Sequence, residues 1–306
     1  MPESPPDLEQ LRRRIDEIDD RLQDLLIERM KIVASVAEAK RSNGGAAAHQ
    51  PAREAEIIRR LIGRSREFPP AMLVRMWREL LSATVRRQGD FAVAVYAPPE
   101  APGYWDVARD HYGSHTPMLP CRSTAQVIRA VTDNQAAVGV LPMPQEGDTE
   151  PDPWWRHLMS SNDNAPHVIA RLPFAARGNA RSDGADALAI GREAEQETGR
   201  DRTLIATENS ADVSRGRMIS VFSGLGLSCR SLASCEHAEG INTLLEVEGF
   251  ISRSDPRLDS FRTQLGPALY RALRLGGYAV PLSPAELGSA TASAHSAAIG
   301  VAAEAL

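Results

Sequence analysis

Two basic side chains near the N-terminus are spaced to bind one small anion. Arg29 stands where the apolar repeat of its helix calls for a leucine, so a guanidinium takes the place of an apolar side chain. Lys40 follows eleven residues later, about 20° from the same helix face and roughly 16 Å along the axis. Two such long side chains reaching toward each other would close most of that gap around a small dianion. A solvated Arg29, or one paired with a carboxylate such as Glu28 of a partner chain, is the alternative.

Arg12 is too far from this pair to reach the same ligand. It lies seventeen residues before Arg29, which is about 25 Å along the helix axis and roughly 100° around it. A small molecule bound between Arg29 and Lys40 is therefore beyond its reach within one chain. If Arg12 takes part in such a site, a second copy of the chain must supply it.

Four further polar residues are candidates for a site. Thr84 and Gln88 fall on the core-facing stripe of a helix, where a buried hydroxyl or amide costs free energy unless it is hydrogen-bonded. Gln88 also lies near the helix end, where it could simply be exposed. Arg53 and Glu54 begin another helix, where Glu54 could serve only as an acid favoured by the helix dipole.

The element that must position Arg29 and Lys40 is one long helix from Asp7 to about Lys40. Its apolar residues recur at a spacing of three and four over several heptads. They are Leu8, Leu11, Ile15, Ile18, Leu22, Leu25, Ile32 and Val36. At about 1.5 Å per residue the helix spans about 50 Å, far more than a compact domain needs. We therefore expect an apolar seam that requires a partner.

Two shorter helices complete an all-α unit over residues 1–90. The Ser-Asn-Gly-Gly stretch at 42–45 breaks the first helix, and a proline at position 51 suits the first turn of a second helix over 51–61. A third helix, with one apolar stripe, is predicted over 70–88.

This unit resembles the all-helical class of chorismate mutases. The matching segments are LRRRIDEIDDRLQDLLIERMKIVASVAEAK, PAREAEIIRRL and ELLSATVRRQ, which cover nearly all of the unit. The resemblance implies a domain-swapped, intertwined homodimer with two sites, each taking an arginine from the opposite chain. That agrees with the distance argument for Arg12. The reaction it implies is the rearrangement of chorismate to prephenate in phenylalanine and tyrosine biosynthesis.

The resemblance also implies how the basic residues would act. Arg12 of one chain and Arg29 of the other would clamp the two carboxylates, while Lys40 and Gln88 would donate to the breaking ether oxygen. The rearrangement is unimolecular and pericyclic, so we expect no metal and no cofactor. The enzyme has to hold the compact conformer and stabilise the charge that develops on the ether oxygen. Gln88 suits neutral pH because an amide donates without first having to take up a proton.

Other residues would complete the implied site. Glu54 would accept from the ring hydroxyl, Arg53 would support that network, and Thr84 would bind near a carboxylate. Gln50 stands three residues before the Arg-Glu pair, where the family often has a charged residue, so we expect weaker substrate binding there. The loop from Ser42 to Gln50 is longer and richer in alanine than the family pattern, so the sequence does not predict whether this loop closes over the site.

Residues 91–200 are predicted to form an α/β lobe with a fainter resemblance to prephenate dehydratases. The predicted strands and helices alternate. Strands are expected near 91–96, 116–121, 136–141 and 166–172, and helices near 104–112, 123–134 and 153–160. AAVGVLPMPQ is similar to a lobe segment of the bifunctional chorismate mutase–prephenate dehydratase. About 110 residues give room for roughly one lobe, and no Thr-Arg-Phe motif occurs, so we expect a degenerate dehydratase region.

Residues 201–285 are predicted to have the βαββαβ order of a ferredoxin-like unit. Strands are expected over 203–208, 228–234, 241–251 and 277–282, and helices over 213–225 and 258–274. The segments LLEVEGFISRSDPRLDSFRTQL and LGGYAVPL resemble an ACT domain, which implies an aromatic amino acid as effector or a role limited to dimerisation. Residues 286–306 are expected to be a flexible tail.

The composition excludes several other classes of protein. The 306 residues are 42% hydrophobic with a net charge of −5; no apolar run approaches the roughly 18 residues of a membrane span, and no basic excess indicates nucleic-acid binding. Three cysteines without CxxC spacing and no secretory signal favour the cytosol and argue against a disulfide framework or a zinc site. Two alternatives stay open: a bifunctional enzyme that retains dehydratase activity, and a non-catalytic dimer that senses a small molecule.

Overall fold

The chain separates into two compact units. The computed structural model describes residues 7–42, 48–65, 67–148, 152–160, 165–175, 181, 185–237 and 240–288. One unit comprises residues 1–48 and 84–90, and the other comprises residues 49–83 and 91–306. Most of the loop from Ser42 to Gln50 and most of the expected tail lie outside the described residues. None of the described helices is both long enough and apolar enough to cross a bilayer.

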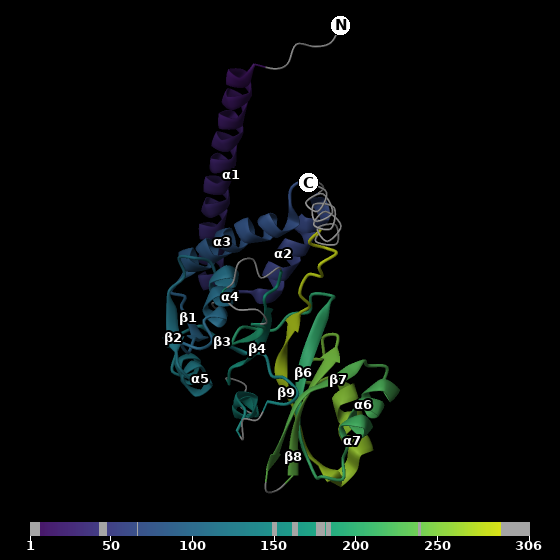
Figure 1. The fold of residues 1–306 in the computed structure, drawn as a ribbon. Coiled ribbons are helices and arrows are strands. Elements are labelled where there is room, and N and C mark those ends of the chain that lie inside the picture. Colours follow the sequence, from purple (N-terminus) through teal and green to yellow (C-terminus); the bar gives the residue numbers. More distant parts are fainter. Residues whose placement is uncertain are drawn as a thin grey trace, which may run out of the picture. The chain divides into compact units, whose positions relative to one another are not determined.

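The predicted long helix is present as α1 (Leu8–Ser42), which Figure 1 draws in dark purple. Its apolar seam is exposed, as the spacing predicts. The exposed fraction is between 42% and 60% for the eight seam residues Leu8, Leu11, Ile15, Ile18, Leu22, Leu25, Ile32 and Val36, and Leu26 and Ile27 beside the seam are exposed to a similar degree. A monomer that leaves this much contiguous apolar surface in water is unusual, and such surfaces mark sites of association.

The two shorter helices are α2 (Pro51–Arg64) and α3 (Pro70–Gln88), so the three predicted helices are confirmed. Pro51 occupies the first turn of α2, where its missing N–H costs nothing. Ala55 and Ile58 from α2 pack with Val74 and Leu81 from α3 in one buried cluster that also includes Phe174.

The rest of the chain is built on one nine-stranded sheet (Figure 1). Its strands are β1 (Val93–Tyr96), β2 (Met118–Cys121), β3 (Val138–Pro142), β4 (His167–Leu172), β5 (Ala187–Gly191), β6 (Asp201–Asn209), β7 (Cys229–His237), β8 (Gly240–Glu248) and β9 (Leu269–Ala279). Their order across the sheet is β2-β1-β3-β5-β4-β9-β6-β8-β7. The sheet is mixed, because β2, β1 and β3 are parallel whereas β5 runs antiparallel to β3 and β4.

The first half of this sheet corrects the predicted lobe in two places. Helices α4 (Gly103–Tyr112) and α5 (Thr124–Thr132) are where the sequence predicts them, but the helix expected over 153–160 is a short 3₁₀ turn, Trp154–Leu158. Both tryptophans of this turn are buried in the core beside the sheet, so packing of these two side chains fixes the segment and a longer helix is not needed. Strand β5 was not predicted, because its short run ALAIG carries no polar alternation.

The second half has the predicted βαββαβ order, formed by β6, α6 (Arg215–Gly224), β7, β8, α7 (Pro256–Leu265) and β9. The helix predicted over 258–274 is wrong beyond Leu265, because Gly266 in a left-handed conformation and the following proline end it. Strand β9 consequently begins at Leu269 and not near residue 277. Helices α6 and α7 share a core on one face of these strands, where the rings of Phe222 and Phe261 stack 4.2 Å apart.

The predicted lobe and the predicted terminal unit share this one sheet. Strand β4 pairs in parallel with β9 through Val168 and Gly276. A Cβ at position 276 would lie 2.2 Å from the carbonyl oxygen of Val168, so the close approach of the two strands requires glycine there.

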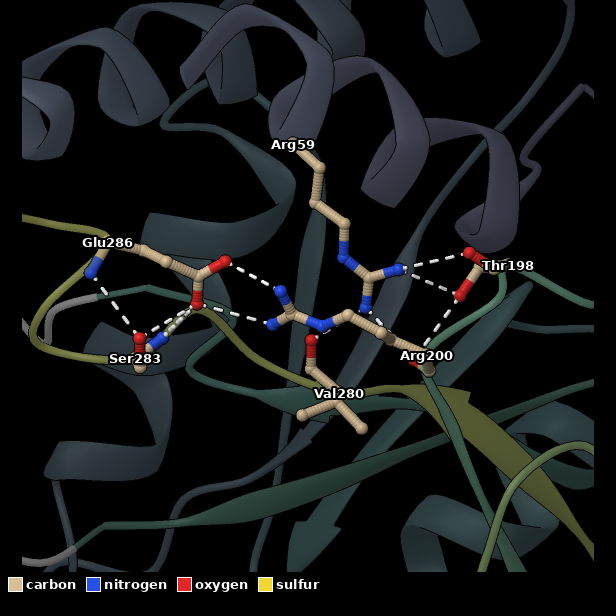
Figure 2. A network of polar contacts seen from close by, with 6 residues as sticks. All are labelled: Arg59, Thr198, Arg200, Val280, Ser283 and Glu286. Carbon is tan, nitrogen blue, oxygen red and sulfur yellow. Dashed lines mark hydrogen bonds and ion pairs between the residues drawn. The ribbon is translucent and has the colours of Figure 1, made fainter. Parts of the chain in front are cut away.

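One arginine ties α2 to the connections at the end of the sheet (Figure 2). Arg59 donates to Thr198 Oγ1 at 2.9 Å and to the carbonyl oxygens of Arg200 at 3.0 Å and Val280 at 2.8 Å. Beside it, Arg200 donates to Glu286 at 2.7 Å, so the network holds together segments that are far apart in the sequence.

Candidate active site

In the unit formed by residues 1–48 and 84–90, three of the predicted site residues are in contact. Arg29 Nη1 donates to Thr84 Oγ1 at 2.6 Å, and Gln88 Nε2 donates to the carbonyl oxygen of Thr84 at 3.2 Å. Arg29 is half-buried, and burial lowers the pKa of its guanidinium from its ordinary value. A cation that keeps only part of its hydration is well suited to bind a carboxylate.

Gln88 adds a second polar group to this contact. Its Oε1 atom is buried and has no hydrogen-bond partner among the described residues. A buried amide oxygen without a donor costs free energy unless a ligand or water satisfies it. Amide oxygen and nitrogen can exchange places by a flip about χ3, so this end of α3 offers either a donor or an acceptor to a bound molecule.

The two other basic candidates lie toward opposite ends of α1. Lys40 is half-buried in the last turn, whereas Arg12 is exposed near the first turn and donates to Glu9 at 2.9 Å. The unbroken helix keeps Arg12 and Arg29 seventeen residues apart, about 25 Å along the axis. Within one chain the structure therefore brings Arg29 together with Thr84 but not with Arg12.

In the other unit, Glu54 is buried in the first turn of α2. Arg78 Nη1 donates to its Oε2 atom at 2.9 Å, and its Oε1 atom faces His49 Nε2 at 4.0 Å. Arg53, in contrast, is exposed and donates to Glu56 at 3.0 Å. Gln50 precedes the helix, where its carbonyl oxygen accepts from the N–H of Glu54.

Sequence reasoning missed three buried ionisable residues around Glu54: His49, Arg78 and Glu193. Arg78 stands between Val74 and Leu81 on the buried stripe of α3, so a cation interrupts an apolar pattern there just as Arg29 does in α1. That signal could have found Arg78. Glu193 gave no such signal, because it lies in an irregular connection more than one hundred residues away.

The electrostatics of this cluster are set by burial and by the two carboxylates. Burial alone would lower the pKa of His49, but its hydrogen bond to Glu193 and the charges of Glu54 and Glu193 outweigh that effect, so the pKa is raised. Burial lowers the pKa of Arg78, against the opposing charge of Glu54. Among the described residues, no group of three or more His, Cys, Asp or Glu side chains is arranged to hold a metal ion.

Comparison with known families matches the helical part of the chain. Residues 11–89 match the family model of chorismate mutase type II. The matched range spans all three helices and contains every predicted site residue, from Arg12 to Gln88. The similarity to chorismate mutases that the sequence indicates is therefore confirmed for this segment.

The relatives found by sequence are bifunctional proteins. The bifunctional chorismate mutase/prephenate dehydratase of Aquifex aeolicus is 32% identical over 142 residues, which cover 45% of this chain and 39% of that protein. The protein of the same description from Pseudomonas aeruginosa is 28% identical over 148 residues, 47% of this chain and 40% of that protein. The chain thus spans about two fifths of the length of these relatives.

Two prephenate dehydratases are among the solved structures found by structural comparison. The enzyme from Streptococcus mutans superposes with a TM-score of 0.46 at 16% identity, covering 62% of this chain and 98% of that one. A prephenate dehydratase from Arthrobacter aurescens in complex with L-Phe gives a TM-score of 0.43 at 12% identity, covering 69% and 99%.

Proposed function

We propose that this protein is a chorismate mutase that converts chorismate to prephenate. The observation that carries the proposal is the match of residues 11–89 to the type II family, a range that contains the cations, the hydroxyl and the amide predicted to bind the substrate. Two hydrogen bonds support it: Arg29 donates to the hydroxyl of Thr84, and Gln88 donates to the main-chain carbonyl of Thr84, so a cation, a hydroxyl and an amide of the predicted site lie in one unit.

In the proposed mechanism the protein acts by positioning and electrostatics. Arg29 binds one substrate carboxylate, with Thr84 beside it, and Arg12 of a second chain binds the other. Lys40 and Gln88 donate to the ether oxygen, where negative charge develops as the C–O bond breaks. Preorganised donors of this kind act most strongly where charge appears only in the transition state, so they raise kcat.

Glu54 has a different role in the proposal. Its carboxylate accepts a hydrogen bond from the ring hydroxyl, which does not change charge during the rearrangement. Such a contact stabilises the bound substrate and the transition state about equally, so its loss raises KM more than it lowers kcat. Arg53, although exposed, is proposed to support this contact, and Gln50 to lie beside it.

We also propose that two chains associate through the exposed apolar seam of α1. A two-fold dimer would bury the exposed seam residues against the same surface of the second copy. It would also supply Arg12 to a site on the other chain, which the distance along α1 forbids within a single chain.

The sheet region carries a second candidate function. The sequence relatives are bifunctional enzymes, which favours prephenate dehydratase activity, while the chain lacks a Thr-Arg-Phe motif. The strand order β9-β6-β8-β7 of the βαββαβ unit supports an ACT-like domain that binds an aromatic amino acid, whether or not the chain has dehydratase activity. Supplying prephenate to the purified chain and measuring phenylpyruvate tests the dehydratase candidate, because only a dehydratase forms that product at a catalytic rate.

The mutase proposal is tested with the two lysines of the chain. Lys40→Ala removes a donor to the ether oxygen and is expected to lower kcat by about 100-fold or more, equivalent to ~3 kcal/mol. Lys31→Ala is the matched control, since Lys31 is exposed on the same helix and has no proposed role. Equal kcat values for the two variants, with both still folded, would show that Lys40 does not act on the substrate.

A further inference from the structure

Four buried ionisable side chains meet at the N-terminal end of α2. His49 precedes the helix, Glu54 lies in its first turn, Arg78 comes from α3, and Glu193 comes from the connection that follows β5. Their exposed fractions are only 4%, 8%, 4% and 7%. Charged groups are rarely this buried unless they are paired, so the cluster must be held together by its own contacts.

The contacts run as a chain from the sheet region to Glu54. Glu193 Oε1 lies 2.7 Å from His49 Nδ1, and His49 Nε2 lies 4.0 Å from Glu54 Oε1. The other carboxylate oxygen of Glu54 is taken by Arg78 at 2.9 Å. His49 Nε2 and Glu193 Oε2 are both buried and have no hydrogen-bond partner within the described part of the chain.

The ring of His49 is held by aromatic neighbours. Its centroid lies 5.1 Å from that of Phe91 and 5.7 Å from that of Tyr112, which meets it edge-on. An imidazole between two rings and bonded at Nδ1 has little rotational freedom, so Nε2 stays directed toward Glu54. The carboxylate of Glu193 lies close to the main chain at Gly191, where an added Cβ would be 2.0 Å from Glu193 Oε2 and would force the carboxylate to shift.

Charge balance favours a protonated His49. With the imidazolium present, two cations, His49 and Arg78, offset the two anions, Glu54 and Glu193. Loss of the proton would leave a net negative charge in a buried site and a bare Nε2 lone pair facing Glu54, both of which cost free energy. The pKa of His49 is accordingly raised, despite its burial.

The other titratable groups that face His49 come from α4, and neither supplies a competing charge. Burial, with the positive charges of Arg78 and His49, keeps the pKa of His111 well below its ordinary value. Burial, with the negative charges of Glu193 and Glu54, keeps the pKa of the Tyr112 hydroxyl well above its own. Both side chains are therefore neutral at pH 7, and Glu193 and Glu54 are left to control His49.

The connection between β5 and β6 makes a second contact, this time with α2 itself. Near the C-terminal end of this connection, Thr198 and Arg200 accept hydrogen bonds from Arg59, which lies five residues after Glu54 on α2 (Figure 2). The connection is therefore fixed both to His49, which precedes α2, and to Arg59 in the middle of α2. A shift of this connection would move the carboxylate of Glu54 or unpair it.

We propose that His49 is a positioning residue for Glu54 and that Glu193 holds His49 in place, so that the β5–β6 connection sets the orientation of the carboxylate that receives the substrate hydroxyl. This inference rests on the proposed mutase function. It gives the sheet region a defined effect on the helical site: whatever displaces residues 192–200 weakens substrate binding through Glu193, without touching the groups that stabilise the ether oxygen.

The test compares two glutamates of the same connection. Glu193→Gln removes the charge that holds His49, whereas Glu197→Gln makes the same chemical change at an exposed position. In Glu193→Gln we expect KM for chorismate at pH 7.5 to rise about tenfold, the loss typical of a hydrogen bond to a charged group, with kcat within about twofold. Glu197→Gln should keep the wild-type KM. Equal KM values for the wild type and Glu193→Gln would overturn the proposal.

A second measurement keeps the test independent of catalysis. The imidazole of His49, assigned by NMR in the full chain, should titrate at least about one pH unit lower in Glu193→Gln than in Glu197→Gln, equivalent to a tenfold change in proton affinity. Unchanged titration overturns the proposal whether or not chorismate reacts. If Glu193→Gln does not fold, the test uses the wild type. Its KM should rise with pH, with the same midpoint as the deprotonation of His49, and a KM that stays constant through that midpoint would overturn the proposal. If the wild type does not consume chorismate but the pKa of His49 still depends on Glu193, the mutase function is refuted and the pairing of His49 with Glu193 stands.

Discussion

Arg59 should contribute more to the stability of the sheet-containing unit than any ordinary surface arginine. Its guanidinium makes three hydrogen bonds of 2.8 to 3.0 Å, to one hydroxyl and two main-chain carbonyl oxygens. At a net contribution of about 1 kcal/mol per bond, Arg59→Ala should lower the free energy of unfolding by about 3 kcal/mol. The side chain is half-buried, so water replaces only part of what is lost.

The assay is urea unfolding followed by tryptophan fluorescence, because Trp154 and Trp155 are buried in the core of the same unit. Arg60→Ala is the matched control: Arg60 is exposed and lies next to Arg59 in α2. The control should change the free energy of unfolding by no more than about 0.5 kcal/mol. A loss in Arg59→Ala no larger than in the control would refute the reasoning that this network fixes α2 to the sheet region.

Three further predictions concern association, catalysis and acid stability. Leu22→Asp should abolish dimer formation in sedimentation experiments, while Gln23→Asp, off the seam, should not; a wild-type monomer contradicts the proposed dimer. The kcat of Gln88→Glu should fall as the pH rises above about 4.3, because an ionised glutamate can no longer donate a hydrogen bond. A kcat that does not change with pH would contradict the proposed role of Gln88 as a donor to the ether oxygen. Hydrogen bonds from Arg200, then from Ser283, lower the pKa of Glu286 to about 2 in the folded chain. Because the pKa is lowered on folding, the ionised carboxylate stabilises the fold above pH 4.5, and this stabilisation is lost as the pH falls from 4.5 toward 2. The free energy of unfolding of Glu286→Gln should therefore fall less over this pH range than that of the wild type. Parallel plots of unfolding free energy against pH for the two proteins would contradict this.

The helical part of the chain was the most predictable from sequence. Its apolar spacing predicts α1 to within two residues at either end, and the exposed seam follows from the same pattern. The apolar stripes single out Arg29 and Thr84 as polar intruders, but the sequence analysis did not predict that the two side chains are in contact. Local periodicity carries this information directly, since one face of a helix must be buried.

The sheet region was less predictable, for reasons that are local in each case. Strand β5 is a short apolar run without alternation, and the joining of β4 to β9 is a pairing between segments about one hundred residues apart. The end of the helix at Leu265 could have been predicted from Gly266 and Pro267, but the sequence analysis extended the helix to residue 274. The pairing of His49 with Glu193 depends on tertiary structure, so no spacing in the sequence could predict it.

The central claim is that the helical segment rearranges chorismate by holding it with cations from two chains. The most direct measurement is the rate of chorismate loss in the presence of the purified full chain, with identification of the product. We expect prephenate to form at a rate proportional to enzyme concentration, and Arg29→Ala to abolish this rate. Chorismate that disappears no faster with the protein than in buffer alone would contradict it.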